Sequence, residues 1–252
     1  MTVEEMLGGI EENGKRIIIG LGSGRCGTMS LAKLINAQTN SVCFHELNPS
    51  GMSWCGAEYT VLSLLRDFTA IIEGEERAIT ADLVSPDRLS IMPRLLELQN
   101  VDVLGDVASY YLPYVELVIS RAPAARFPCM RRDKKETIDS FVNKLSELPN
   151  EKPRNPWACL EDRRWRHDPI WDRCFPKTSK VNGEDLAEYI GEYYDEYYRE
   201  AEIVEREHRE NFRIFDTNDL NSNEGRSEIL NFCLPDADHK NFHVHKNKRK
   251  SH

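Results

Sequence analysis

Short apolar runs alternate along the chain with longer segments in which apolar residues recur every three or four positions. The runs predict strands at 17–19, 41–46, 101–107, 127–130 and 212–215. The longer segments predict helices from residue 28, over 57–73, over 86–98, up to about 120, from about 134, over 183–210 and up to about 232. Because strands that alternate with helices form parallel sheets, we expect an α/β fold, with three α/β/α layers around a central parallel sheet.

The first strand leads into a glycine-rich turn that opens a helix. The run Ile17–Ile19 is typical of a strand buried on both faces. Glycines follow at positions 20, 22, 24 and 27, and apolar residues return at helical spacing from Thr28. Free backbone N–H groups and the positive end of a helix converge at such a turn. The turn is therefore predicted to bind a phosphate group.

Two general templates fit the turn in part. A Walker A loop has the spacing of Gly22 and Gly27, but Thr28 stands where that loop has its lysine. The dinucleotide fingerprint Gly-x-Gly-x-x-Gly is present, and Glu46 follows roughly 20 residues later, where a ribose-binding acid is expected. An NAD(P)-binding Rossmann-type oxidoreductase is therefore one interpretation of this turn.

A third template accounts for more of the turn. Residues 23–31 resemble the 5′-phosphosulfate-binding loop of sulfotransferases that use 3′-phosphoadenosine 5′-phosphosulfate (PAPS), which has a Lys or Arg, a small residue, Gly and Thr just before a helix. The resemblance gives Arg25 a catalytic role, because a fixed guanidinium stabilises charge on a leaving phosphate. It implies a cofactor-binding loop made of Ser23, Gly24, Arg25, Cys26, Gly27, Thr28, Met29 and Ser30.

A second motif lies about a hundred residues further along the chain. The strand 127–130 runs into Arg-Arg-Asp, and Ser140 follows Arg132 by eight residues. This segment resembles the 3′-phosphate-binding segment of the same family. After a turn and about two helical turns, a hydroxyl returns beside the guanidinium, so both groups can bind one phosphate. The oxidoreductase interpretation gives these two residues no role, and the pair of motifs therefore favours a sulfotransferase.

The end of the second strand supplies the candidate base. Ligands of open α/β sheets bind beyond the carboxyl ends of the strands, so His45 and Glu46 are expected beside the first loop. Many sulfotransferases carry a glutamate here, and the resemblance makes Glu46 the candidate for removing the acceptor proton, with His45 as the alternative.

The third strand departs from the family pattern. Carbohydrate-modifying sulfotransferases often have a lysine near its end, where this chain has Val107. Asp106, Ser109 and Tyr110 are candidate pocket residues there. The missing lysine also keeps open a catalytically inactive nucleotide-binding protein on the same fold.

The resemblance implies transfer of a sulfonate group from PAPS to a hydroxyl, or less favourably an amine, with adenosine 3′,5′-bisphosphate as product and without a metal ion. The acceptor would be a small molecule, a lipid or a glycan. The implied fold is that of P-loop nucleotide kinases. We expect a single domain over 1–252, with a core at about 15–235, a lid or substrate loop at 150–180 and a flexible, basic, histidine-containing tail at 236–252.

Composition indicates which partners and which cellular location to expect. A net charge of −9 argues against a nucleic-acid partner. The acidic segment 1–15 lacks the features of a signal peptide, and no apolar stretch reaches the length of a membrane span. Seven cysteines without disulfide-like or metal-like spacing favour a reducing, cytoplasmic location. The tyrosines between residues 189 and 198 recur at helical spacing and are expected in the core.

Overall fold

The computed structural model describes residues 14–75, 77–81, 83, 87–146, 186–235 and 240. The predicted lid at 150–180 lies outside these residues, and so does the predicted tail apart from Lys240. The backbone N–H of Lys240 donates to Oε1 of Gln38 at 2.9 Å, and Nε2 of Gln38 donates to the Lys240 carbonyl at 3.2 Å.

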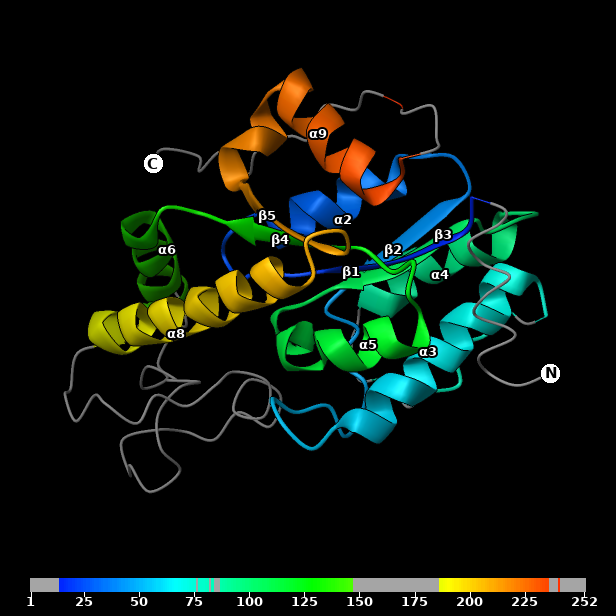
Figure 1. Cartoon of the computed structure of the whole chain (residues 1–252), viewed down its shortest axis with the longest axis horizontal. Coiled ribbons are helices and arrows are strands. Elements are labelled where there is room, and N and C mark those ends of the chain that lie inside the picture. Colours follow the sequence, from blue (N-terminus) through cyan, green and yellow to red (C-terminus); the bar gives the residue numbers. More distant parts are fainter. Residues whose placement is uncertain are drawn as a thin grey trace.

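Parallel strands form the centre of the described structure (Figure 1). They are β1 (Arg16–Gly20), β2 (Ser41–His45), β3 (Val103–Val107), β4 (Phe127–Arg131) and β5 (Phe212–Asp216). Strand β3 pairs with both β1 and β2, and β4 pairs with β5. The N–H groups of Ile19 and Leu21 donate to the carbonyls of Arg126 and Pro128 at 3.0 and 2.9 Å, which joins β1 to β4. The strand order is therefore β2-β3-β1-β4-β5.

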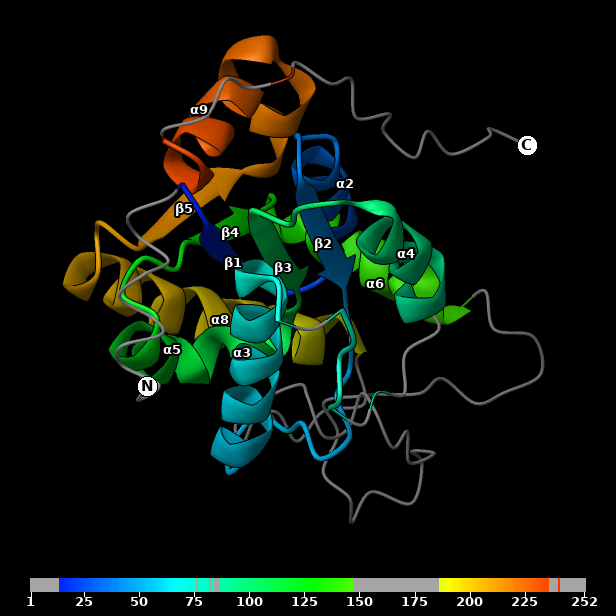
Figure 2. The ribbon, with the colours of Figure 1, turned by 90° about the vertical axis from the view of Figure 1, so that its right-hand side faces the viewer.

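Helices cover both faces of this sheet, as Figures 1 and 2 show. One layer contains α2 (Thr28–Asn36) and α9 (Asn223–Cys233); the other contains α3 (Glu58–Glu73), α5 (Val115–Arg121) and α8 (Leu186–Glu207). Helix α4 (Asp87–Glu97) lies against the edge strand β2, where Arg94 Nε donates to the Ser41 carbonyl at 2.8 Å. Helix α6 (Lys134–Ser146) packs against α8. The predicted three-layer α/β/α fold with a parallel sheet is confirmed.

The central strand shows why its sequence is an unbroken apolar run. Ile17 and Ile19 belong to the core formed with α3, α5 and α8, whereas Ile18 belongs to the core formed with α2 and α9. Successive side chains point to opposite faces of a strand. Since both faces are covered by helices, every position of β1 is buried, and no polar alternation remains in the sequence.

Two predicted helices differ in detail from the structure. The segment after β3 forms a 3₁₀-helix, η1 (Ser109–Tyr114), before α5 begins, and Pro113 lies inside this 3₁₀-helix. The long helix α8 ends at Glu207 rather than residue 210, where the N–H groups of Asn211 and Phe212 donate to the His208 carbonyl. A second 3₁₀-helix, η2 (Thr217–Asn221), follows β5. None of the helices in the described ranges combines the length and apolar character needed to cross a membrane.

Candidate functional site

The residues from Gly20 to Thr28, hereafter the glycine loop, occupy the point where the chain changes direction in the sheet. From β1 the chain passes first to β2 and β3 on one side, and only later to β4 and β5 on the other. The carboxyl end of β1 therefore lies at a topological switch point, where open α/β sheets bind their ligands. The predicted phosphate loop is thus in the expected place.

The backbone of the glycine loop needs its glycines. Gly22, Gly24 and Gly27 have φ values of 149°, 90° and 96°. A Cβ on Gly22 would lie 2.4 Å from the Cys26 sulfur and 2.9 Å from the Met130 carbonyl oxygen, which is too close for either contact. Arg25 adopts a φ of 55°, although it is not a glycine. This left-handed turn keeps the loop tight and carries the exposed Arg25 side chain at its surface.

The first turn of α2 remains open to an anion. Gly27 is the residue before the helix and has no side chain to cap it, and the first turn contains no acidic residue. By contrast, Ser222 caps α9 by accepting a hydrogen bond from the Gly225 N–H at 2.9 Å. An uncapped helix start presents free N–H groups and positive potential to an anionic ligand.

Tyrosine hydroxyls of α8 form hydrogen bonds with the backbone of the glycine loop and of the neighbouring strand β4. The N–H of Gly22 donates to the Tyr197 hydroxyl at 3.0 Å. The Tyr193 hydroxyl donates to the Ser23 carbonyl at 2.9 Å, and the Tyr198 hydroxyl donates to the Met130 carbonyl at 2.7 Å. Burial raises the pKa of all three phenols well above the ordinary value, so their hydroxyls remain protonated.

These tyrosines are core residues, as the sequence predicted, but their hydroxyls have a role that sequence reasoning missed. A signal was present: a buried helix face needs only apolar residues, whereas tyrosine brings a hydroxyl that must find a partner. The repeated choice of tyrosine over phenylalanine along one face of α8 therefore pointed to polar groups beneath it.

Further contacts hold the back of the loop. The Thr217 hydroxyl, at the start of η2, donates to the carbonyls of Cys26 and Arg131, which ties the glycine loop to β4. Cys26 itself is fully buried, and burial raises the pKa of its thiol. Cys26 therefore acts as a small residue in a tight turn and not as a reactive thiolate.

The second predicted motif meets the glycine loop directly. Nε of Arg25 donates to Oγ of Ser140 at 3.1 Å, and Nη1 of Arg132 donates to the Arg25 carbonyl at 3.4 Å. Nε of Arg132 also forms an ion pair with Oε2 of Glu136 at 2.8 Å. Asp133 caps α6 by accepting a hydrogen bond from the Glu136 N–H at 2.9 Å. Two guanidinium groups and a hydroxyl from distant parts of the chain thus converge on one exposed edge.

The end of β2 lies on the other side of the loop. Nε2 of His45 lies 3.1 Å from Oγ1 of Thr28, the first residue of α2. The next residue, Glu46, is half-buried and has a φ of 55°. Burial raises the pKa of Tyr193, and the negative charge of Glu46 raises it further. The Glu46 carboxylate therefore interacts electrostatically with the tyrosine whose hydroxyl donates to the Ser23 carbonyl.

Comparison with known proteins defines the family. A profile of the sulfotransferase domain matches residues 17–219, a span that begins in β1 and ends in η2. The chain belongs to the sulfotransferase domain family. A crystal structure of a sulfotransferase from Alicyclobacillus acidocaldarius resembles it with a TM-score of 0.48 and 15% sequence identity, over 86% of this chain and 79% of that one. Comparison with curated protein sequences gives no match.

Other residues of this sulfotransferase-family chain lie less directly at the site. The Met29 side chain is 45% exposed and Ser30 is half-buried, both on the first turn of α2. Val107 is fully buried and packs against Gly20, where an added Cβ would lie 2.6 Å from its Cγ2. Val107 therefore fills the contact between β3 and the loop and offers no cation there.

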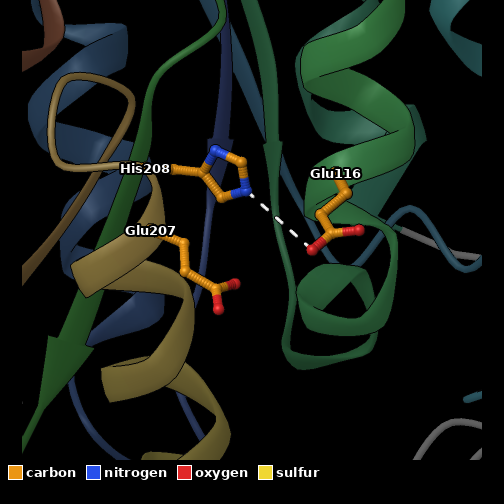
Figure 3. A group of neighbouring side chains, drawn as sticks. All are labelled: Glu116, Glu207 and His208. Carbon is orange, nitrogen blue, oxygen red and sulfur yellow. Dashed lines mark ion pairs between the residues drawn. The ribbon is translucent and has the colours of Figure 1, made fainter.

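A separate group of polar side chains lies near the amino end of β5, whereas the glycine loop follows the carboxyl end of the parallel strand β1. Glu116, Glu207 and His208 place one potential metal ligand each within 4.8 Å of one another, and Figure 3 shows them between α5 and the end of α8. Nε2 of His208 lies 4.0 Å from Oε1 of Glu116. Because both carboxylates are exposed, the group is accounted for as solvated surface side chains.

Proposed function

We propose that this chain transfers a sulfonate group from PAPS to a hydroxyl group of an acceptor. One observation carries the proposal: Arg25, Arg132 and Ser140, which come from two motifs, are joined by hydrogen bonds beside the open start of α2. A donor with a 5′-phosphosulfate and a 3′-phosphate has two anionic groups that need such a pair of sites. Sulfotransferase family membership supports the same reaction.

The residues fit this donor in chemistry and in placement. The N–H groups of residues 24–28 and of the first α2 turn would bind the 5′-phosphosulfate, and Arg132 with Ser140 would bind the 3′-phosphate. As the bond between sulfur and the phosphate oxygen breaks, Arg25 would stabilise the charge that remains on that oxygen. Glu46, or His45 as the alternative, would take the proton of the acceptor hydroxyl while its oxygen bonds to sulfur.

Binding of adenosine 3′,5′-bisphosphate tests the donor site. Calorimetric titration in EDTA should show micromolar binding to the wild type. Arg132→Ala should weaken it about 10- to 100-fold, because a charge-assisted hydrogen bond contributes about 1.5–3 kcal/mol. The matched control is Arg213→Ala, which removes an exposed arginine of β5 that pairs with Glu228 of α9, and it should leave bisphosphate affinity unchanged.

NADH is the comparison ligand in this titration. A preference for NADH over the bisphosphate would overturn the proposed donor and favour the oxidoreductase interpretation. Bisphosphate binding that is unchanged in Arg132→Ala would overturn the proposed 3′-phosphate site. Arg25→Ala should lower the rate of sulfonate transfer far more than bisphosphate affinity, since its role is in the transition state. Equal losses of both would contradict that role.

The buried Val107 favours one second candidate. A nucleotide-binding protein without transfer activity would also retain both phosphate sites while lacking the cation expected near the end of β3. It would bind the bisphosphate yet release no sulfonate from PAPS to a broad panel of small-molecule, lipid and glycan acceptors.

A further inference from the structure

The turn that follows β2 holds the candidate base on an unusual backbone. Glu46 and Asn48 have φ values of 55° and 47°, in the left-handed region that residues other than glycine rarely adopt. Between them, the Leu47 side chain is fully buried. Such a turn persists only where surrounding contacts hold it. Residues 46–48, hereafter the base turn, therefore need hydrogen bonds from neighbouring residues to keep this backbone conformation.

A buried carboxyl group at the end of β3 makes these contacts. The Leu47 N–H donates to Asp106 Oδ2 at 3.2 Å and to Oδ1 at 3.4 Å. The Asn48 N–H donates to the Tyr110 hydroxyl at 2.9 Å, and this hydroxyl donates in turn to Asp106 Oδ2 at 3.3 Å. The two backbone amides that follow Glu46 are therefore connected to the Asp106 carboxyl group, that of Leu47 directly and that of Asn48 through the Tyr110 hydroxyl.

Two further groups donate to Asp106. The Val107 N–H donates to Oδ1 at 2.9 Å, and the Tyr111 hydroxyl donates to Oδ2 at 2.9 Å. Asp106 is fully buried, and this burial raises its pKa to about 6, although the Tyr111 hydrogen bond and the charge of His45 act in the opposite direction. A set of donors matches an ionised carboxylate, which only accepts.

We propose that Asp106 is a positioning residue that fixes the base turn and so holds the Glu46 carboxylate beside the glycine loop. The inference rests on the proposed function, in which Glu46 takes the acceptor proton. Donor binding uses the glycine loop, Arg132 and Ser140 and does not require the base turn. Loss of the Asp106 carboxylate should therefore affect transfer and leave donor binding intact.

The test compares Asp106→Asn with Asp67→Asn. Asp67 is a matched control on α3: its buried carboxylate accepts from the Thr80 N–H at 2.8 Å, the Thr80 hydroxyl at 2.7 Å and the Ala81 N–H at 2.9 Å. Asp106→Asn should keep the affinity for adenosine 3′,5′-bisphosphate within about twofold and lower the rate of sulfonate release from saturating PAPS, with an acceptor panel present, by about tenfold or more. Asp67→Asn should change neither quantity.

A second measurement follows the contact itself. In the wild type, the amide NMR signals of Leu47 and Val107 should shift together as pH passes through the Asp106 pKa of about 6. Both shifts should vanish in Asp106→Asn. If this variant does not fold, Tyr111→Phe removes a single donor to the carboxylate and should slow transfer less, again without weakening bisphosphate binding.

The outcomes separate this inference from the function on which it rests. Wild-type transfer by Asp106→Asn, or Leu47 and Val107 amide signals that are unchanged in this variant, would overturn the positioning role alone. A parallel loss of bisphosphate affinity would make Asp106 a general structural residue instead. A wild-type protein that binds no bisphosphate or transfers no sulfonate would overturn both proposals.

Discussion

The two sides of the candidate site, the glycine loop and the start of α6, are held by different kinds of interaction. On the loop side, Ser23, Cys26 and Thr28 are buried, and the backbone is held by neutral tyrosine hydroxyls from within the core. On the side of α6, the Arg132 and Glu136 side chains are 33% and 62% exposed and are held by an ion pair in solvent. The structure of the glycine loop therefore depends on close packing and neutral hydrogen bonds, whereas the position of the Arg132 side chain depends on an exposed ion pair.

This difference predicts different responses to the same perturbations. Buried neutral hydrogen bonds are not screened by salt, whereas exposed ion pairs are. Changes on the loop side should therefore alter folding stability as well as binding. Changes on the α6 side should alter binding and its salt dependence but leave stability almost unchanged.

The largest expected effect comes from Gly22→Ala. The new Cβ would meet the Cys26 sulfur and the Met130 carbonyl at a φ of 149°, so the free energy of unfolding should fall by about 3 kcal/mol. Gly74→Ala is the matched control, because Gly74 also has a positive φ but no atom within 4 Å of an added Cβ; it should cost about 1 kcal/mol. Denaturant unfolding measures both, and equal losses would show that the loop is not shape-limited.

The buried carboxyl behind the base turn gives the next effect. Its pKa rises from 3.8 to about 6 on folding, so the folded state binds more protons between these values. Its contribution to stability is therefore fully present below pH 3.8 and is lost as pH rises through 6, a change of roughly 3 kcal/mol at 1.36 kcal/mol per unit. The unfolding free energy of wild type relative to Asp106→Asn should fall by this amount between pH 3.5 and 7, and a constant difference would contradict the burial effect.

A smaller effect is expected from Tyr198→Phe. The Met130 carbonyl would lose its donor and Ser23 would lose a partner, so stability should fall by about 1–3 kcal/mol. The loss should be the same in low and high salt. Tyr59→Phe changes a tyrosine that is 84% exposed and should have no effect. A loss in Tyr198→Phe that disappears in high salt would place this contact with the exposed side of the site.

The smallest effect concerns the exposed side. Glu136→Gln releases Arg132 from its ion pair, so bisphosphate affinity at low salt should rise by up to about fivefold, in line with about 0.2–1 kcal/mol for an exposed pair. Glu202→Gln removes the equivalent partner of Arg131, with both side chains similarly exposed, and serves as the control. Thermal unfolding should be unchanged in both variants. A weaker affinity in Glu136→Gln would show that the ion pair positions Arg132 for its ligand.

The sequence by itself determined the local parts of this protein. Strand, glycine turn and helix followed from residues 17–35 because apolar period and glycine content act over a few residues. The eight-residue spacing of Arg132 and Ser140 was also readable from the sequence, and in the structure each of the two residues contacts Arg25. The family resemblance and the three-layer parallel sheet followed from these local patterns and are confirmed by the profile match and the strand order.

Only the tertiary structure decided how these parts meet. Arg25 and Ser140 are 115 positions apart, and Tyr193 reaches the Ser23 carbonyl across 170 positions. No periodicity records such pairs, because side-chain direction on a helix is fixed locally but its partner depends on how helix and sheet pack. For the same reason, the sequence indicated Asp106 as a candidate pocket residue but did not indicate its hydrogen bond with the Leu47 N–H, which joins the ends of the adjacent strands β3 and β2. Which residue types are suitable at these positions depends on burial, which the sequence pattern indicates. Which residues become their partners depends on the order of the strands, which only the tertiary structure shows.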